Sequence, residues 1–150
     1  MNSTQLTSCL LLQFFLVTQA GSAVTVQDEK PKLDRSGKTK TGEASYYGRK
    51  FYGKEMANGE TMKPDSNNAA SKTLPLGTTA KVTNVESGKS DVVVITDRGP
   101  YVDGRIIDVS PQTAKDLDFK QEGVAKVKVK PLNIPKQENP ADDKAPAAKK

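Results

Sequence analysis

Carboxyl groups are the strongest candidates for proton-transfer chemistry in this sequence, because the chain contains no histidine. Asp97 stands out among them, since it follows the apolar run 91–96 and precedes the turn residues Gly99 and Pro100. A carboxyl group at the end of a buried strand can be half-buried and positioned to give or take a proton. The residues alone favour a simpler interpretation, in which Asp97 caps the turn or pairs with Arg98.

The composition excludes several other kinds of site. Without histidine, the commonest zinc ligand and the commonest general base at neutral pH are missing, so a zinc site and a Ser-His-Asp triad are ruled out. The one cysteine, Cys9, lies near the N-terminus, so the rest of the chain has no disulfide and no thiol chemistry. We therefore expect neither a metal nor a cofactor.

The positive charge of the chain does not indicate nucleic-acid binding. The net charge of +5 divides into +2 for residues 24–41, +2 for residues 42–132 and +1 for residues 133–150. No basic stripe with interleaved aromatic residues occurs, so nucleic acid is not an expected partner. A weak attraction to an anionic wall or membrane surface is the expected effect of this charge.

The first 23 residues are expected to be a signal peptide. The apolar run 10–17 is too short to span a bilayer, and small residues follow it at 20–23, which resembles a secretory signal cleaved after Ser22 or Ala23. This predicts an exported protein of the periplasm or cell envelope without a stable membrane span. Because residues 1–7 contain no Lys or Arg, a buried strand or a misassigned start is the alternative interpretation.

The remaining chain is expected to hold one folded domain between two polar tails. Residues 24–41 are charged and have no apolar periodicity, which predicts a flexible linker. Residues 133–150 are rich in Pro, Ala, Lys and Asp, which predicts a disordered tail. The folded domain is then expected at residues 42–132.

Strand patterns dominate this domain and must position Asp97. Four strands are predicted, two of them paired as a hairpin around the turn 86–89: residues 79–85, 91–96, 105–109 and 124–130. The β-branched run 91–96 is expected to be buried on both faces. Ser110 and Pro111 predict the start of a helix that continues over 112–117. Short strands with one or two helical turns indicate a small closed barrel.

Eight segments follow one another in the order of a known family. They are GEASYYG at 42–48, FYGK at 51–54, ANGE at 57–60, AASKTLPLGT at 69–78, VTN at 82–84, GKS at 88–90, ITDRGPY at 95–101 and GRIIDVS at 104–110. Together they resemble the rare lipoprotein A family of double-psi β-barrels. The resemblance implies an all-β fold, a six-stranded barrel, in an exported protein of the bacterial envelope.

Some members of that family are peptidoglycan lytic transglycosylases that prefer glycan strands stripped of stem peptides. The resemblance implies endolytic cleavage of MurNAc–GlcNAc bonds that leaves 1,6-anhydro-MurNAc ends. Asp97 matches the catalytic aspartate and would act first as acid and then as base. Glu60 matches the second acidic position, where it would hold the sugar or tune Asp97; an exposed loop glutamate is the alternative.

Ser71 departs from the family pattern, because it stands where members have a catalytic histidine. A hydroxyl does not titrate near neutral pH, and losing a general acid or base typically costs roughly 10²–10⁴ in rate. Three outcomes stay open: Asp97 works alone, Glu60 takes over, or the protein is a non-catalytic glycan-binding module of the cell wall or division site. An expansin-like wall-loosening protein is a further hypothesis.

Five other residues are candidates for substrate binding at the matched positions. The tyrosines could stack on sugar rings or pack in the core, and the other two could orient the site or stabilise turns: Tyr46, Tyr47, Tyr101, Asn84 and Arg98. The expected partners are peptidoglycan glycan strands, with cell-division or wall proteins as further candidates.

Overall fold

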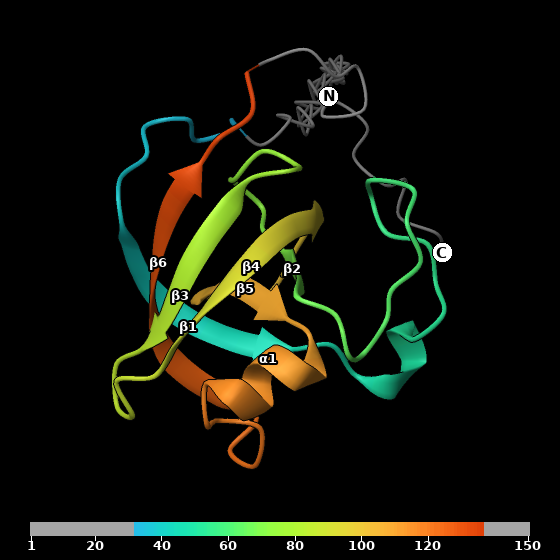
Figure 1. Cartoon of the computed structure of the whole chain (residues 1–150), viewed down its shortest axis with the longest axis vertical. Coiled ribbons are helices and arrows are strands. Elements are labelled where there is room, and N and C mark those ends of the chain that lie inside the picture. The colour runs from blue at the N-terminus through green and yellow to red at the C-terminus, as the bar shows by residue number, and fades with distance from the viewer. Residues whose placement is uncertain (1–31, 137–150) are drawn as a thin grey trace, which may run out of the picture.

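The computed structural model of the chain describes residues 32–136, and within them six strands close into a barrel (Figure 1). The strands are β1 (Lys40–Tyr46), β2 (Asn68–Ala70), β3 (Thr79–Asn84), β4 (Ser90–Asp97), β5 (Arg105–Val109) and β6 (Val124–Asn133). Around the barrel they follow the order β1-β5-β2-β4-β3-β6. The expected six-stranded all-β barrel is confirmed. The expected signal peptide, residues 1–23, lies outside the described residues.

Two parallel strand pairs give the barrel its crossed connections. β1 pairs with β5 and β2 pairs with β4 in parallel, whereas the other four neighbouring pairs are antiparallel. Parallel neighbours cannot be joined by a tight turn, and here other strands lie between them along the chain: β2 to β4 between β1 and β5, and β3 between β2 and β4. Five of the candidate site residues lie in the segments between strands: Tyr47, Glu60, Ser71, Arg98 and Tyr101.

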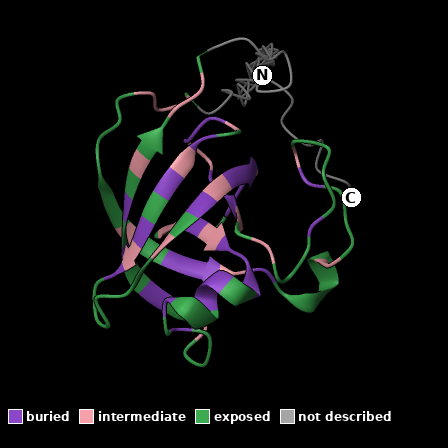
Figure 2. Ribbon diagram, in the orientation of Figure 1, coloured by how far each residue is buried: buried purple, intermediate pink, exposed green. Residues whose placement is uncertain are grey.

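The core follows from the alternation of side chains along the strands (Figure 2). Val93 and Ile95 of β4 pack inside the barrel, as do Val127 and Val129 of β6. The expectation that 91–96 is buried on both faces is wrong, because Val92 is 41% exposed. The run lies in a barrel wall, where a strand has one inner and one outer face, so the outer valines meet solvent.

A second apolar cluster covers the outer face at the end of β4. It consists of Tyr47, Met56, Met62 and Ala70, and it is formed by the long connection between β1 and β2. The Asn58 amide donates to the Thr96 carbonyl across 3.0 Å and ties this connection to β4. Because of this cover, a side chain at the end of β4 is half-buried.

One end of the barrel is closed by the helix α1 (Pro111–Asp116), and a 3₁₀ turn, η1 (Arg49–Phe51), follows β1. The Ser110 hydroxyl accepts a hydrogen bond from the Thr113 amide at 3.1 Å, which confirms the predicted N-cap. After α1, Leu117 and Phe119 are fully buried in the core. The predicted helix therefore covers one end of the barrel.

Residues 32–39 lie along the barrel ahead of β1, although they belong to the segment expected to be a linker. The Asp34 amide donates to the Thr73 carbonyl at 2.6 Å, and Arg35 Nη1 donates to the Pro135 carbonyl at 2.6 Å. Lys40 Nζ lies 2.9 Å from Asp34 Oδ2. This strap, as we call residues 32–39, thus contacts the turn after β2 and the end of β6.

None of the helices within residues 32–136 is long and apolar enough to cross a membrane.

Candidate functional site

Asp97 is the last residue of β4, and an irregularity in the pairing with β2 turns it outward. Ala69 pairs with Ile95, whereas the next residue, Ala70, pairs with Asp97, so Thr96 has no partner on β2. A bulge of this kind re-aims the side chain that follows it. Ile95 therefore faces the core, while Asp97 faces the outer cluster with Ala70.

Three donors hold the Asp97 carboxylate. Oδ1 accepts hydrogen bonds from the amides of Ala57 at 3.0 Å and Arg98 at 2.8 Å. Oδ2 accepts one from the Tyr47 hydroxyl at 3.2 Å. An ionised carboxylate has about four acceptor positions. Oδ2 therefore keeps room for a further contact and is the oxygen best placed to exchange a proton.

Tyr47 is a buried donor beneath this carboxylate. Burial, followed by the charge and hydrogen bond of Asp97 and then the charge of Asp108, raises the pKa of Tyr47 well above its ordinary value. The phenol therefore stays protonated at neutral pH and can always donate. Its ring packs edge-to-face against Phe51, with 5.9 Å between the ring centroids. This geometry makes Tyr47 a positioning residue rather than an exposed stacking platform.

A second carboxylate, Asp108, lies on the same face as Asp97. Ala70 pairs with Asp97 on one side and with Asp108 on the other, so the two Cα atoms are separated by about 10 Å, or two strand spacings. Ser45 Oγ donates to Asp108 Oδ1 at 2.5 Å, and Arg105 Nη2 lies 3.5 Å from Oδ2. The sequence-based reasoning did not select Asp108. Its place between the inward-facing Ile107 and Val109 was the signal that it points outward.

Ser71 is directly beside Asp97 but its hydroxyl is already used. The Ser71 amide donates to the Asp97 carbonyl at 3.1 Å, and Ser71 Oγ accepts from the Leu74 amide at 3.2 Å. The side chain is almost fully buried. Ser71 thus stabilises a turn next to the candidate acid.

Comparison with known proteins shows the family to which this chain belongs. Residues 39–129 match the family described as lytic transglycolase. The sequence is 45% identical over 104 residues to the endolytic peptidoglycan transglycosylase RlpA of Vibrio cholerae, covering 69% of this chain. The chain belongs to the RlpA family. The match covers 40% of the Vibrio protein, and a 47% identical match over 107 residues covers 47% of RlpA from Rickettsia bellii. The chain therefore aligns with less than half the length of these RlpA proteins.

Solved structures with a similar fold are more distant than these RlpA sequences. An expansin of Clavibacter michiganensis superposes with a TM-score of 0.51 and 16% identity, covering 67% of this chain and 54% of the expansin. The Streptomyces papain inhibitor superposes with a TM-score of 0.50 and 23% identity, covering 65% of this chain and 96% of the inhibitor. These likenesses concern the barrel fold alone.

Glu60, at the second acidic position of the RlpA pattern, lies in the loop that holds Asp97. The Met56 amide donates to the Glu60 carbonyl at 2.8 Å, and the Glu60 amide donates to Asn58 Oδ1 at 3.0 Å. The side chain is exposed, and its carboxylate makes no hydrogen bond or ion pair within residues 32–136. The loop thus brings Glu60 to the neighbourhood of Asp97 without fixing its carboxylate.

Arg98 holds the turn that contains the position of the RlpA histidine. Its Nη1 donates to the carbonyls of Ser71 at 3.3 Å and Leu74 at 2.7 Å, and the side chain is buried. Arg98 therefore stabilises the backbone of the turn beside Asp97.

The structure separates Asn84 from the other candidates. Asn84 is the last residue of β3, next to the pair of Thr83 with Ser90 at the start of β4, whereas Asp97 ends β4. Its Nδ2 donates to the Leu117 carbonyl at 2.9 Å, and its Oδ1 accepts from the Glu86 amide at 2.9 Å. The Asn84 side chain thus stabilises the turn after β3 and the C-terminal end of α1, away from Asp97.

The remaining tyrosines differ in exposure. Tyr101 follows Asp97 in the next loop and is 69% exposed, which leaves its ring available to a ligand. Tyr46 is half-buried against the core, and with Tyr47 and Tyr52 it lines a cavity of about 580 Å³ between η1 and α1. Because the Tyr47 hydroxyl binds Asp97, this aromatic cavity adjoins the site.

Metal binding has no support in the described part of the chain. Across residues 32–136, no group of three or more Asp, Glu, His or Cys side chains could hold a metal ion.

Proposed function

We propose that this RlpA-family domain is an endolytic lytic transglycosylase that cleaves MurNAc–GlcNAc bonds in peptide-free peptidoglycan strands. The observation that carries the proposal is the Asp97 carboxylate, which is held by three donors at the outward end of β4 and is only partly buried. The aromatic cavity lined by Tyr46 and the exposed ring of Tyr101 supply surfaces that suit sugar rings.

The proposed reaction needs one carboxyl group in two successive roles. Protonated Asp97 gives its proton to the leaving O4 of GlcNAc as the bond from that oxygen to C1 of MurNAc breaks. The resulting carboxylate takes the proton from the MurNAc 6-hydroxyl as O6 forms a bond to C1. Water is not consumed, and Asp97 ends in its starting state. The negative charge of Asp108 on the same face favours the positive charge that develops at C1.

Because the nucleophile is part of the substrate, this cycle does not require a second titrating side chain. Ser71 cannot replace the histidine of other RlpA members, since its hydroxyl does not titrate and is bonded to the Leu74 amide. Tyr47 keeps Asp97 oriented during both steps. The proposal therefore assigns the proton transfers to Asp97, with Glu60 as an exposed carboxylate in the loop that holds it.

A second candidate function is glycan binding without cleavage, and the buried hydroxyl at Ser71 favours it. In that case the barrel would be a wall or cell-division module that recognises the same strands. An expansin-like activity is the third candidate, and a preference for cellulose over peptidoglycan would support it.

Export to the cell envelope is part of the proposal, as are partners among wall or cell-division proteins. It is supported by the leader pattern at residues 1–23 and by the membership in the RlpA family. N-terminal sequencing of the secreted protein should find Ala23 or Val24 as the first residue. An intact N-terminus on protein that stays in the cytoplasm would refute it.

The activity is tested by mass spectrometry of peptide-free glycan strands after incubation with the full chain. Wild type and the distant control Asp118→Asn should produce 1,6-anhydro ends, and Asp97→Asn should lose them by roughly 10²–10⁴ in rate. Ser71→His tests the departure from the family, since a cavity adjoins that position. No product from wild type together with product from Ser71→His would establish the binding module instead.

A further inference from the structure

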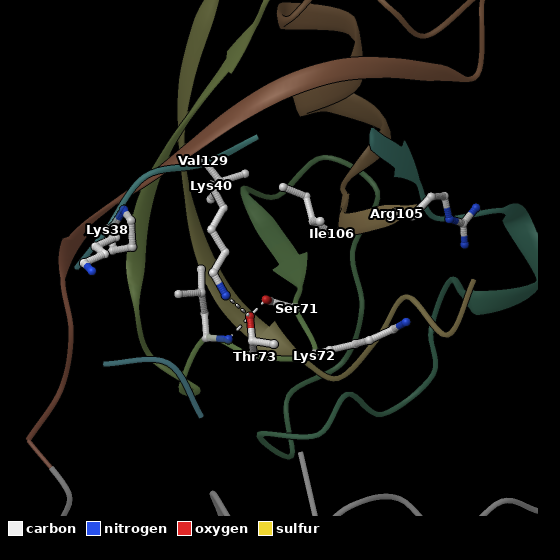
Figure 3. A pocket seen from close by; sticks show the side chains of 10 residues that line it. Lys38, Lys40, Ser71, Lys72, Thr73, Arg105, Ile106 and Val129 are labelled. Carbon is white, nitrogen blue, oxygen red and sulfur yellow. Dashed lines mark hydrogen bonds between the residues drawn. The ribbon is translucent and has the colours of Figure 1, made fainter. Parts of the chain in front are cut away.

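A small cavity with a cationic rim opens beside the Ser71 turn (Figure 3). Its volume is about 120 Å³, and its apolar wall includes Leu74, Ile106 and Val129. All of its charged lining side chains are cations: Lys38, Lys40, Lys72 and Arg105. Such a site fits a small anion that carries an apolar group.

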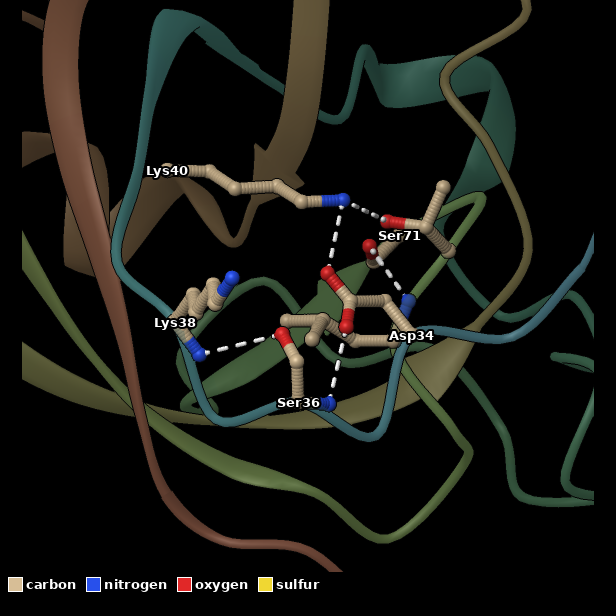
Figure 4. Close-up of polar contacts among 7 residues, drawn as sticks. Asp34, Ser36, Lys38, Lys40 and Ser71 are labelled. Atoms are coloured by element: carbon tan, nitrogen blue, oxygen red, sulfur yellow. Dashed lines mark hydrogen bonds and ion pairs between the residues drawn. The ribbon is translucent and has the colours of Figure 1, made fainter.

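One edge of this rim already holds a carboxylate from the chain itself (Figure 4). Asp34 of the strap lies 2.9 Å from Lys40 Nζ, which also donates to Thr73 Oγ1 at 3.4 Å. Hydrogen bonds from Ser36, followed by the contact with Lys40, hold the pKa of Asp34 well below its ordinary value. The ammonium group of Lys40, on the rim of the cavity, is thus already paired with a carboxylate.

Two of the other three cations, Lys72 and Arg105, have N–H groups without an acceptor in the described part of the chain. Lys72 makes no hydrogen bond or ion pair within residues 32–136. Arg105 has one contact of 3.5 Å with Asp108, and its buried Nε has no hydrogen-bond partner in the described part of the chain. Figure 3 shows Lys72 and Arg105 extending to the same side of the cavity, past Ile106. Lys72 and Arg105 thus lie at the rim of the cavity, and part of their hydrogen-bonding capacity is unused within residues 32–136.

This pair lies next to the proposed catalytic residue. Lys72 follows Ser71, whose amide donates to the Asp97 carbonyl, and Arg105 approaches Asp108 on the strand that flanks Ala70. The cavity is thus connected to Asp97 through the backbone of Ser71 and to Asp108 through Arg105.

We propose that the cavity binds the lactyl carboxylate of a peptide-free MurNAc residue, with Lys72 and Arg105 on the carboxylate and the lactyl methyl group against Ile106. This inference rests on the proposed function and adds a specificity determinant to it. A stem peptide converts that carboxylate to an amide, which removes the charge that Lys72 and Arg105 would contact. Selection of stripped strands then follows from charge.

The test compares binding of the full chain to stripped strands before and after their carboxylates are converted to methylamides. Calorimetric titration should give a dissociation constant about tenfold lower for the unmodified strands, as expected for a charged hydrogen bond. Lys72→Gln should reduce this ratio, and Lys72→Gln with Arg105→Gln should abolish it. Lys81→Gln and Lys128→Gln, exposed lysines on β3 and β6, should leave it unchanged. Thermal melts show whether each variant is folded.

Equal affinity of wild type for both kinds of strand would overturn the inference, while 1,6-anhydro products from the same protein would leave the proposed function standing. A loss of preference in the Lys81 and Lys128 variants as large as in Lys72→Gln would also overturn it, because general charge attraction would then suffice. If no strand binds and none is cleaved, both proposals fail.

Discussion

The hydroxyl of Tyr47 donates to Oδ2 of Asp97 across 3.2 Å, so the residue that follows β1 supports the residue that ends β4. The two strands are not neighbours in the barrel, since β5 and β2 lie between them. A buried phenol thus spans the outer cluster to present its one polar atom to the proposed catalytic carboxyl. This contact fixes the carboxylate more firmly than the bulge in β4 alone could.

Removing this hydroxyl should impair catalysis more than folding. Tyr47→Phe keeps the ring against Phe51 but leaves Oδ2 of Asp97 without its donor. A hydrogen bond to a charged group contributes about 1.5–3 kcal/mol, so kcat on stripped strands should fall about 10- to 100-fold with little change in KM. The variant Asp118→Asn, distant from Asp97, is the control. An unchanged kcat in Tyr47→Phe would show that Asp97 does not need the hydrogen bond from Tyr47.

Tyr47 should also make the domain sensitive to alkaline pH. Its pKa in the folded state is raised above the ordinary value of 10.0, so above that pH the unfolded chain loses a proton that the folded chain keeps. The stabilising contribution is therefore complete below pH 10 and is lost as the pH rises further. Urea denaturation at pH 8 to 11 should show a steeper decline for wild type than for Tyr47→Phe. Parallel curves for the two proteins would argue against this assignment.

The strap should detach from the barrel when Asp34 loses its charge. Because its pKa in the docked state lies below the ordinary value of 3.8, docking is fully favoured above that pH and weakens as the pH falls below it. Asp34→Asn should produce the same detachment at neutral pH. Hydrogen exchange of the Asp34 and Ser36 amides reports it, with Asp118→Asn as a control. Retained protection in Asp34→Asn would mean that the bonds to Thr73 and Pro135 suffice.

Gly42 should be intolerant of a side chain because Ile106 covers it. A Cβ at this position would lie 2.6 Å from Ile106 Cγ2, so Gly42→Ala must displace the wall of the cationic cavity. Overpacking of this kind costs about 1–3 kcal/mol in the free energy of unfolding. Gly48→Ala is the control, since nothing lies within 4 Å of its Cβ. Equal stabilities of the two variants in urea would contradict the close contact.

Elements with strong local patterns were predictable from the sequence. The capped helix at Ser110 and the valine–lysine alternation of 124–130 both appear as expected. β2 was not predictable as a strand, because Asn68–Ala70 has no β-branched run and pairs only through its neighbours β4 and β5. Local propensity is weak there, and tertiary pairing decides.

The sequence was enough to propose Asp97 as a site residue, but it did not indicate which residues hold its carboxylate. A strand end followed by a turn marks an outward carboxyl, and the family resemblance points to the same residue. The donors from Tyr47 and Ala57 are 50 and 40 residues away in sequence, so no local pattern could reveal them. Asn84 shows the converse: it matched the family pattern, yet its amide is committed to Leu117 and Glu86.

The last strand of the barrel pairs with both β1 and β3. A nascent chain therefore cannot close the barrel until it has been made as far as Asn133, long after Asp97 and every residue that contacts it. Folding of such high contact order is slow compared with local helix formation. The strand that completes the barrel wall is thus the last of the six to be synthesised, and the face that carries Asp97 and Asp108 belongs to an open sheet until β6 pairs with β1 and β3.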